Sequence, residues 1–294
     1  MANTTSYDLS TSSTINVFNW IETNWDPSIH ITAYNKAQII NKFSQLNSDA
    51  GKPGRNFNVR SLANFADQTA TVNNNHNLAG LTNAGTAEAV VSGTAETRYV
   101  FISVKEQTLA QLIVDPMQPF RNGAESALME GIDEVGAGLF DNLSNTIGSP
   151  AANIDASLLL EGITTLASNA KQYWQPGTSK TAYLCSHHNQ INDILDDPKF
   201  VQADFRGDSA NAMVNGWVHK AYGVTVTTSG NIQSSSSAYH NALFIPEAFG
   251  IGWNQRMKVQ KDRDGLEISI IPWADYVIME KQDYLAVDIQ TTTA

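Results

Sequence analysis

The one group of residues whose types and spacing could support covalent chemistry is Cys185-Ser186-His187-His188. A thiol beside an imidazole can act as a nucleophile paired with a base, and histidines are common metal ligands. Catalytic cysteines and histidines are, however, usually distant in sequence, and adjacent histidines point to different faces of a strand or a helix. Cys185 also ends an apolar run, where a cysteine packs as a small hydrophobic residue. We therefore expect Cys185 to be a buried packing residue, with a Cys-His hydrolase as the catalytic alternative.

Other motifs of catalysis and cofactor binding are missing from the sequence. It contains no phosphate-binding loop of the Walker type and no nucleophile elbow. The run from Gly136 to Asp141 lacks the third glycine of a dinucleotide fingerprint and lies inside a helical pattern. The run from Asp262 to Gly265 begins like a calcium loop, but its glycine comes too early and no glutamate follows at loop position twelve. We expect no enzyme activity, no cofactor and no metal site.

The composition argues against several classes of protein. The chain has 294 residues, with 18 Lys and Arg against 29 Asp and Glu, and a net charge of -11. Proteins that read nucleic acids usually carry basic patches, so this balance argues against that class. The single cysteine excludes an internal disulfide framework. No run reaches the roughly 18 apolar residues of a membrane span, and residues 1–13 lack the features of a signal peptide, so we expect a soluble, intracellular chain.

The most regular pattern predicts a long amphipathic helix over residues 120–143, with Pro119 just ahead of it as a starter. Its apolar residues recur every three or four positions and so share one face. They are Ala124, Leu128, Ile132, Val135, Leu139 and Leu143. The acidic residues fall on the opposite, solvent face, and they are Glu130, Asp133, Glu134 and Asp141. Four glycines lower the helix propensity, so this helix needs tertiary packing, and the glycines allow close backbone approach.

Residues 55–98 are predicted to form a long projecting hairpin. An extended run that begins at Phe57 gives way to a polar, Asn- and Gly-rich stretch, and a strand follows over residues 98–104. Such a stretch is normally functional or disordered when it interrupts a compact domain. Strand signals on both sides favour the two arms of a hairpin, and a disordered surface loop is the alternative.

The two ends of the chain differ in character. In residues 1–54 the apolar residues gather in two patches, 14–25 and 29–46, which need a surface to lie on; two ordinary helices of the main core are the alternative. Beyond residue 148 helix and strand signals alternate, and we expect an α+β fold class, with a helix-and-sheet body flanked by extended accessories. We expect helices over 158–174 and 191–195, the second capped by Ser186, strands over 181–185, 224–227 and 242–245, a hairpin over 256–271, and a last strand over 276–289.

The order of these elements resembles the major capsid proteins of tailed bacteriophages, which have the Hong Kong 97-type fold. Three stretches carry the resemblance: Tyr183 to Ile191 is similar to the family's buried strand and following helix, Asn215 to Ser229 to its "G-hydrophobic-x-V-x-x-S" strand, and Ala242 to Gly252 to a strand that turns back toward the body. The helix around Glu125 to Glu134 is similar in kind to the family's spine helix. The resemblance covers roughly residues 55–290 and lies in the order of the elements rather than in any single motif.

The resemblance implies an α+β, Hong Kong 97-like capsid fold in five regions. These are an N-terminal arm (1–54), an extended β-hairpin loop across a neighbouring subunit (55–98), a peripheral domain with the spine helix (99–150), a helix-and-sheet axial domain (151–254) and the return strands of the peripheral domain (255–294). The loop would carry the residues of the assembly interface, and we expect these to be Phe57, Phe65, Leu78 and Leu81.

The resemblance also implies a function. The chain would be a structural protein of the virion, assembled in the host cytoplasm, that forms hexamers and pentamers of an icosahedral shell around double-stranded DNA. Its partners would be scaffolding and portal proteins and a decoration protein, with no membrane and no sequence-specific contact to the packaged DNA. The chain has no room for a long cleavable scaffolding segment, and we match no Lys, Asn and Glu set for cross-linking between subunits. The shell of a bacterial nanocompartment, which has the same fold, is the alternative.

Overall fold

The computed structural model describes residues 37–46, 56–62, 71–72, 78–79, 88–111, 117–171, 173–201, 218–264 and 267–293. A seven-stranded sheet forms the centre of the body, in the order β10-β11-β9-β13-β16-β8, with β12 paired to β13. Its strands are β8 (Thr146–Gly148), β9 (Ala182–His187), β10 (Lys220–Ala221), β11 (Val224–Ser229), β12 (Ser234–Ser235), β13 (Ala238–Phe244) and β16 (Ala286–Thr292). Strand β9 pairs with β11 in parallel and with β13 in antiparallel orientation. Every residue of β13 except Tyr239 is buried, as expected for a central strand covered on both faces.

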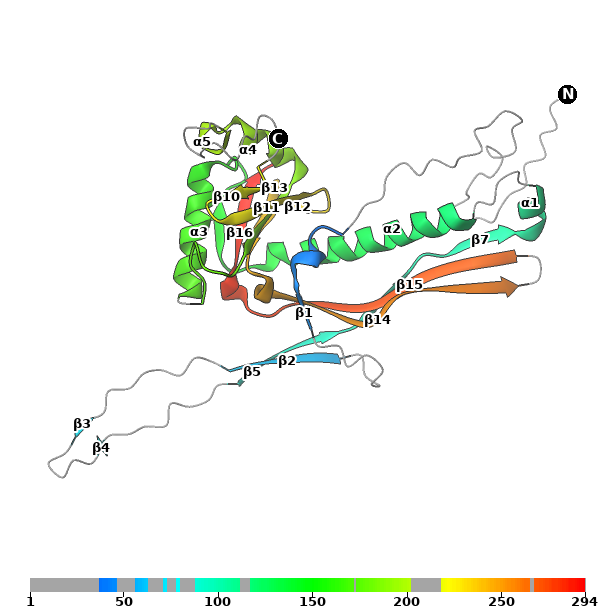
Figure 1. Cartoon of the computed structure of the whole chain (residues 1–294), viewed down its shortest axis with the longest axis horizontal. Helices are drawn as coiled ribbons and strands as arrows, with labels where there is room; N and C mark the ends of the chain where they lie inside the picture. Colours follow the sequence, from blue (N-terminus) through cyan, green and yellow to red (C-terminus); the bar gives the residue numbers. More distant parts are fainter. Residues whose placement is uncertain are drawn as a thin grey trace.

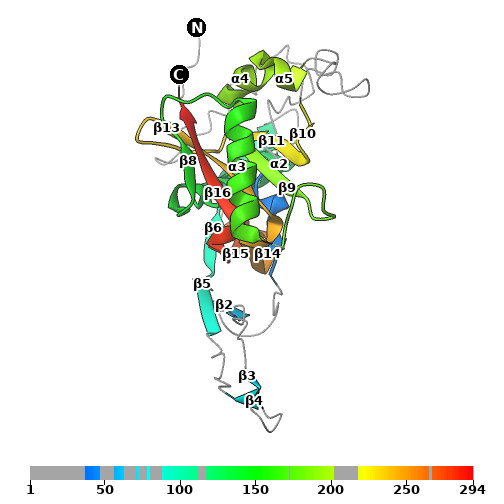
Figure 2. The same cartoon turned by 90° about the vertical axis from the view of Figure 1, so that its left-hand side faces the viewer.

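Helix α3 (Ala156–Ala170) lies along this sheet (Figure 2). Asp155 caps the helix by accepting a hydrogen bond from the N–H of Leu158 at 2.7 Å. Gly162 lets α3 approach the sheet closely, because a methyl group there would lie 3.3 Å from the side chain of Leu243. The helix begins two residues before the predicted start and ends at Ala170.

The predicted cap at Ser186 is wrong. Ser186 is a buried residue of β9, and the cap belongs to His187, whose Nδ1 accepts the N–H of Asn189 at 3.1 Å. A short 3-10 turn (His188–Gln190) follows, and then α4 (Ile191–Asp196) and α5 (Pro198–Val201).

The spine helix is α2 (Met117–Ala137), which at 1.5 Å per residue is about 31 Å long. The helix ends six residues before the predicted end, and a 3-10 turn (η3, Phe140–Asn142) follows it. Pro119 lies in the first turn of the helix rather than ahead of it. Glu130 and Glu134 are exposed as expected. Asp133 is fully buried instead. Its carboxylate can be buried because it accepts backbone hydrogen bonds from Ile39 and Ile40, which are far away in the sequence.

A second, five-stranded sheet runs beside α2 (Figure 1). Its centre is a long antiparallel hairpin of β14 (Phe249–Asp264) and β15 (Glu267–Glu280), so the hairpin predicted over 256–271 is confirmed and is longer than expected. β1 (Ser44–Gln45) pairs with β14, whereas β6 (Glu96–Tyr99) and β7 (Ile102–Lys105) pair with β15. The strand predicted over 98–104 is therefore two strands, and a short helix, α1 (Glu106–Gln111), follows them.

The expected single strand over residues 276–289 is also wrong. Tyr276 belongs to β15, the chain turns at Asp283–Leu285, and β16 then pairs with β13 in the body sheet. Residues 286–292 thus lie away from the other return strands of 255–294. The turn is held at Lys281, whose N–H donates to the carbonyl of Ala248 at 2.7 Å. Apolar residues stand at alternate positions of the sequence both at the end of β15 and in β16, so their spacing alone gives no sign that the chain changes sheet between the two strands.

The body, the spine helix and the second sheet meet at a cluster of buried aromatic rings. Phe43 stacks on Phe249 with ring centres 4.8 Å apart, and Phe140 and Phe244 complete the cluster at 5.6 and 5.2 Å from Phe249. The four rings come from the segment before β1, from η3, from β13 and from β14, and each is at most 4% exposed. This cluster joins parts of the chain that are distant in sequence.

A buried histidine adds a polar connection at the same junction. Nδ1 of His240 on β13 lies 2.9 Å from Oδ2 of Asp288 on β16, and its Nε2 lies 3.2 Å from Oδ1 of Asp141 in η3. Burial raises the pKa of Asp288, whereas the hydrogen bond from His240 opposes that rise. The imidazole thus connects two strands of the body sheet through Asp288 and lies close to η3, the turn that follows the spine helix.

Candidate assembly interface

A two-stranded ribbon extends away from both sheets (Figures 1 and 2). Strands β2 (Asn56–Leu62) and β5 (Glu88–Thr94) pair in antiparallel register along their whole length, and β3 (Thr71–Val72) pairs with β4 (Leu78–Ala79) farther out. The predicted hairpin in residues 55–98 is therefore present. A ribbon of two strands buries little of its own apolar surface and is only marginally stable by itself in water, so packing on another surface would stabilise it.

The root of this hairpin is packed tightly on β15. A methyl group at Gly93 would lie 2.5 Å from the side chain of Val277 and 2.7 Å from that of Met279, so a larger residue there would displace these side chains. Phe57 lies on the second sheet of its own chain, since a methyl group at Gly252 would be 3.0 Å from its ring. The root of the hairpin is therefore packed on the second sheet.

The four residues predicted for the assembly interface have different positions. Phe57 is half-buried at the hairpin root, whereas Leu78 lies in β4, opposite Val72. Phe65 and Leu81 lie outside the described residues. The role of the four residues in assembly stays a prediction.

A pair of exposed aromatic residues marks the edge of the second sheet. Tyr99 ends β6 and is 66% exposed, and Phe101 precedes β7 and is 58% exposed. On the hairpin, Val90 of β5 is also 52% exposed. Among the described strands, β6 and β7 pair only with β15, so their outer edge is open. Open strand edges with apolar side chains are prone to contact another chain.

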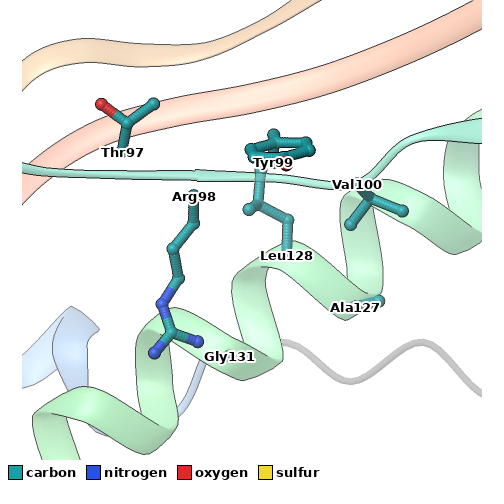
Figure 3. A pocket seen from close by; sticks show the side chains of 7 residues that line it. All are labelled: Thr97, Arg98, Tyr99, Val100, Ala127, Leu128 and Gly131. Carbon is teal, nitrogen blue, oxygen red and sulfur yellow. The ribbon is translucent and has the colours of Figure 1, made fainter.

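The same edge borders a pocket of about 310 Å³ against the spine helix (Figure 3). Residues of β6, the residue that follows β6 and residues of α2 line it: Thr97, Arg98, Tyr99, Val100, Ala127, Leu128 and Gly131. Arg98 reaches from β6 to the helix, where a methyl group at Gly131 would lie 2.8 Å from its Nη1. The sequence prediction missed this surface, although the alternation of Tyr99 and Phe101 across Val100 was a usable signal for two side chains on one face.

The Cys-His arrangement does not have the geometry of a nucleophile and its base. Cys185 is 1% exposed, and burial raises the pKa of its thiol to about 12. His187 stacks on Tyr239 with ring centres 3.9 Å apart, and its Nδ1 is occupied by the N–H of Asn189. Burial lowers the pKa of His187, and the neighbouring His188 lowers it further by a smaller amount. A nucleophilic cysteine needs a lowered pKa and access to solvent, and Cys185 has neither.

The described ranges also bear on metal binding and on membrane insertion. No group of three or more His, Cys, Asp or Glu side chains in these ranges is placed to hold a metal ion. No helix in the part of the chain that the structure describes is both long and apolar enough to cross a membrane. The extended hairpin and the exposed edge at Tyr99 and Phe101 are candidate contact surfaces.

Comparisons with known proteins identify the fold. No protein-family model matches the chain, and no curated protein matches its sequence. Among solved structures, one of Mycobacterium phage Che8 has a TM-score of 0.71 at 14% identity, covering 92% of this chain and 97% of that chain. The capsid structure of the cyanophage P-SCSP1u has a TM-score of 0.69 at 12% identity, covering 96% of each chain.

The mature capsid of bacteriophage PhiM1 is similar as well, with a TM-score of 0.70 at 10% identity, covering 93% of this chain and 92% of that chain. The likeness extends over nearly the full length of both chains in each case. The chain therefore has the α+β fold of tailed-phage major capsid proteins, the Hong Kong 97-type fold, and the resemblance inferred from the sequence is confirmed at the level of the fold.

Proposed function

We propose that this chain is the major capsid protein of a tailed bacteriophage. Copies of it assemble as hexamers and pentamers into an icosahedral shell around packaged double-stranded DNA. The observation that carries the proposal is the likeness to phage capsid structures over nearly the full length of both chains, with the projecting β2–β5 hairpin in place. At such low identity the likeness establishes the fold, so the function itself rests on this argument.

The exposed features of the chain support assembly. In the proposed shell, the hairpin of one subunit lies across its neighbour, and the exposed edge at Tyr99 and Phe101 is covered by another copy. Tyrosine and phenylalanine are enriched in the centres of protein interfaces because they bury much area with few rotatable bonds. The division into arm, extended loop, peripheral domain, axial domain and return strands belongs to the same proposal.

The chemistry of the chain favours a structural role over an enzymatic one. The buried Cys185 thiol, with a pKa of about 12, argues against the Cys-His hydrolase. The net charge of -11 fits a shell that lets DNA slide, since attraction to phosphate would hold the DNA on the lining. A virion location, assembly in the host cytoplasm, and scaffolding, portal and decoration proteins as partners follow from this role.

A deletion of the outer hairpin tests the proposal. Residues 63–87 are replaced by a short Gly-Ser linker, which leaves β2, β5 and the packing of Gly93 in place. We expect the subunit to keep its circular dichroism spectrum, because every strand of the body sheet lies outside the replaced residues, and to form no shells in electron micrographs. The control replaces the exposed turn 176–179 of the body by a linker of equal length and should still give shells.

The outcomes separate the candidate functions. Shells from the unchanged protein and none from the deletion support a capsid protein, whereas normal shells from the deletion refute the assigned role of the hairpin. A 32 kDa monomer at every concentration would refute the shell itself. Neighbouring genes for a terminase and a portal would favour a phage over a nanocompartment, which is the second candidate with this fold.

A further inference from the structure

Residues 37–46, which we name the clasp, cross the junction of the body, the spine helix and the second sheet (blue beside the label β1 in Figure 1). They follow the N-terminal 36 residues and precede the hairpin that begins at Asn56. Ile39, Ile40 and Phe43 of the clasp are between 0 and 4% exposed. The clasp is therefore a closely packed segment that lies, along the chain, between residues 1–36 and the hairpin.

The first half of the clasp is held by a single buried carboxylate. Oδ1 of Asp133 accepts the backbone N–H groups of Ile39 at 2.9 Å and of Ile40 at 3.0 Å, and Oδ2 accepts that of Gln38 at 3.3 Å. Asn231, in the turn after β11, donates its side-chain N–H to Oδ2 at 3.1 Å. Asp133, which is more than 90 positions away in the sequence, thus caps the 3-10 turn (η2, Ile40–Lys42). Through Asn231 it also joins the clasp and α2 to the turn that follows β11 of the body sheet.

The second half of the clasp is held by packing and by one short strand pair. The Phe43 ring stacks on Phe249, and the Ser44 hydroxyl donates to the Phe249 carbonyl at 2.7 Å. β1 pairs with β14 at only two residues, and Leu46 covers Gly250. On the other side, Gly136 of α2 leaves room for Ile40 and Phe43, because a methyl group there would lie 2.9 Å and 3.2 Å from them.

We propose that Asp133 is the positioning residue of the N-terminal arm, and that the clasp it holds can open while the body stays folded. The body sheet does not include β1, so its strand pairs survive when the clasp leaves. Opening exposes three backbone N–H groups and the carboxylate, which water can then satisfy, and also the apolar side chains of Ile39, Ile40 and Phe43, whose exposure to water sets the cost of opening. If the arm and the hairpin contact neighbours, as in the proposed function, the clasp sets the position from which both extensions start.

Hydrogen exchange of the unassembled full chain tests this inference. In Asp133→Asn, an amide N–H replaces one acceptor oxygen and faces the N–H groups of the clasp. We expect the protection of the peptide containing Ile39 and Ile40 to fall about 10- to 100-fold, as for the loss of a hydrogen bond to a charged acceptor. Peptides of β9 and β13 should keep their protection. The matched control, Glu134→Gln, changes the next residue on the exposed face and should leave both unchanged.

A second pair of variants opens the clasp without changing the carboxylate. Gly136→Ala adds a methyl group that displaces Ile40 and Phe43, and it raises the helix propensity of α2 at the same time. Gly123→Ala makes the same change on the same helix where nothing lies within 4 Å. We expect faster exchange in the clasp for Gly136→Ala only. If Asp133→Asn does not yield folded protein, this pair of variants tests whether the clasp opens while the body stays folded.

Two results would overturn the inference. Unchanged protection at Ile39 and Ile40 in these variants would mean that Asp133 does not hold the clasp. A loss of protection in β9 and β13 equal to that in the clasp would mean that the clasp is an inseparable part of the core. Both results are read on the single subunit, so they do not depend on whether shells form.

Discussion

The body and the extended features of this chain differ in how completely each buries its apolar residues. In the body, Phe244, Ala242 and Val287 are fully buried within the described structure. On the hairpin and the edge of the second sheet, Val90, Tyr99 and Phe101 are more than half exposed. The body therefore contains what it needs to stay folded, whereas the extended features leave apolar area for another molecule to cover. Substitutions should separate the two: those in the body should change unfolding, and those at the edge should change association.

The largest effect on unfolding is expected for Phe244→Ala. This ring contacts Phe43, Phe140 and Phe249, so its removal leaves a cavity where three parts of the chain meet. Phenylalanine-to-alanine changes in such cores cost about 3 to 5 kcal/mol. The measurement is chemical denaturation of the subunit followed by circular dichroism. A loss below about 1 kcal/mol would show that the aromatic cluster does not hold the body together.

A smaller effect is expected for Gly148→Ala, at the edge of the body sheet. Gly148 has a φ of 78°, and a methyl group there would lie 2.3 Å from the carbonyl oxygen of Gln290 on β16. We expect a loss of about 2 to 3 kcal/mol in the free energy of unfolding, from backbone strain and the displaced strand.

Gly177→Ala is the matched control for Gly148→Ala. Gly177 has a φ of 90° and nothing within 4 Å of an added methyl group, so only the strain of about 1 kcal/mol should appear. Equal losses in the two variants would contradict the argument from the Gln290 contact.

The same contrast explains how much could be predicted from the sequence. The hairpins, the long helix, the fold class and the buried Cys185 were predictable because they depend on local patterns of apolar residues and turns. Asp133 was placed on the wrong face because its partners are the N–H groups of Ile39 and Ile40, and no helical periodicity reports a partner so far away. The change of sheet before β16 could not be predicted for the same reason, because its partner strand β13 is also far away in the sequence. The pocket beside Tyr99 depends on how β6 lies over α2, which is also a non-local property.

Cys185→Ala should cost about 1 kcal/mol, because it removes one buried sulfur atom from the body. The native thiol should resist alkylation at neutral pH, since its pKa of about 12 leaves almost no thiolate. The raised pKa also gives a direction for the pH dependence. The thiol contributes fully to stability below its unfolded pKa of 9.0, and this contribution is lost as the pH rises toward 12. Rapid alkylation of the folded protein at neutral pH would contradict the burial of this residue.

The smallest effect on unfolding is expected for Tyr99→Ser and Phe101→Ser, and it is the sharpest test of the comparison. Because these side chains are 66% and 58% exposed in the single subunit, their loss should change the free energy of unfolding by no more than about 0.5 kcal/mol. Phe140→Ser, at a fully buried ring, should unfold the subunit and serves as the control. Association should respond in the opposite way, since each lost aromatic contact weakens an interface by about 1 to 2 kcal/mol and the loss recurs at every copy of that contact. Sedimentation velocity should therefore show that the concentration needed for assembly rises for the two edge variants. Unchanged assembly would mean that this edge faces solvent in the assembled state and that the contact surface lies elsewhere.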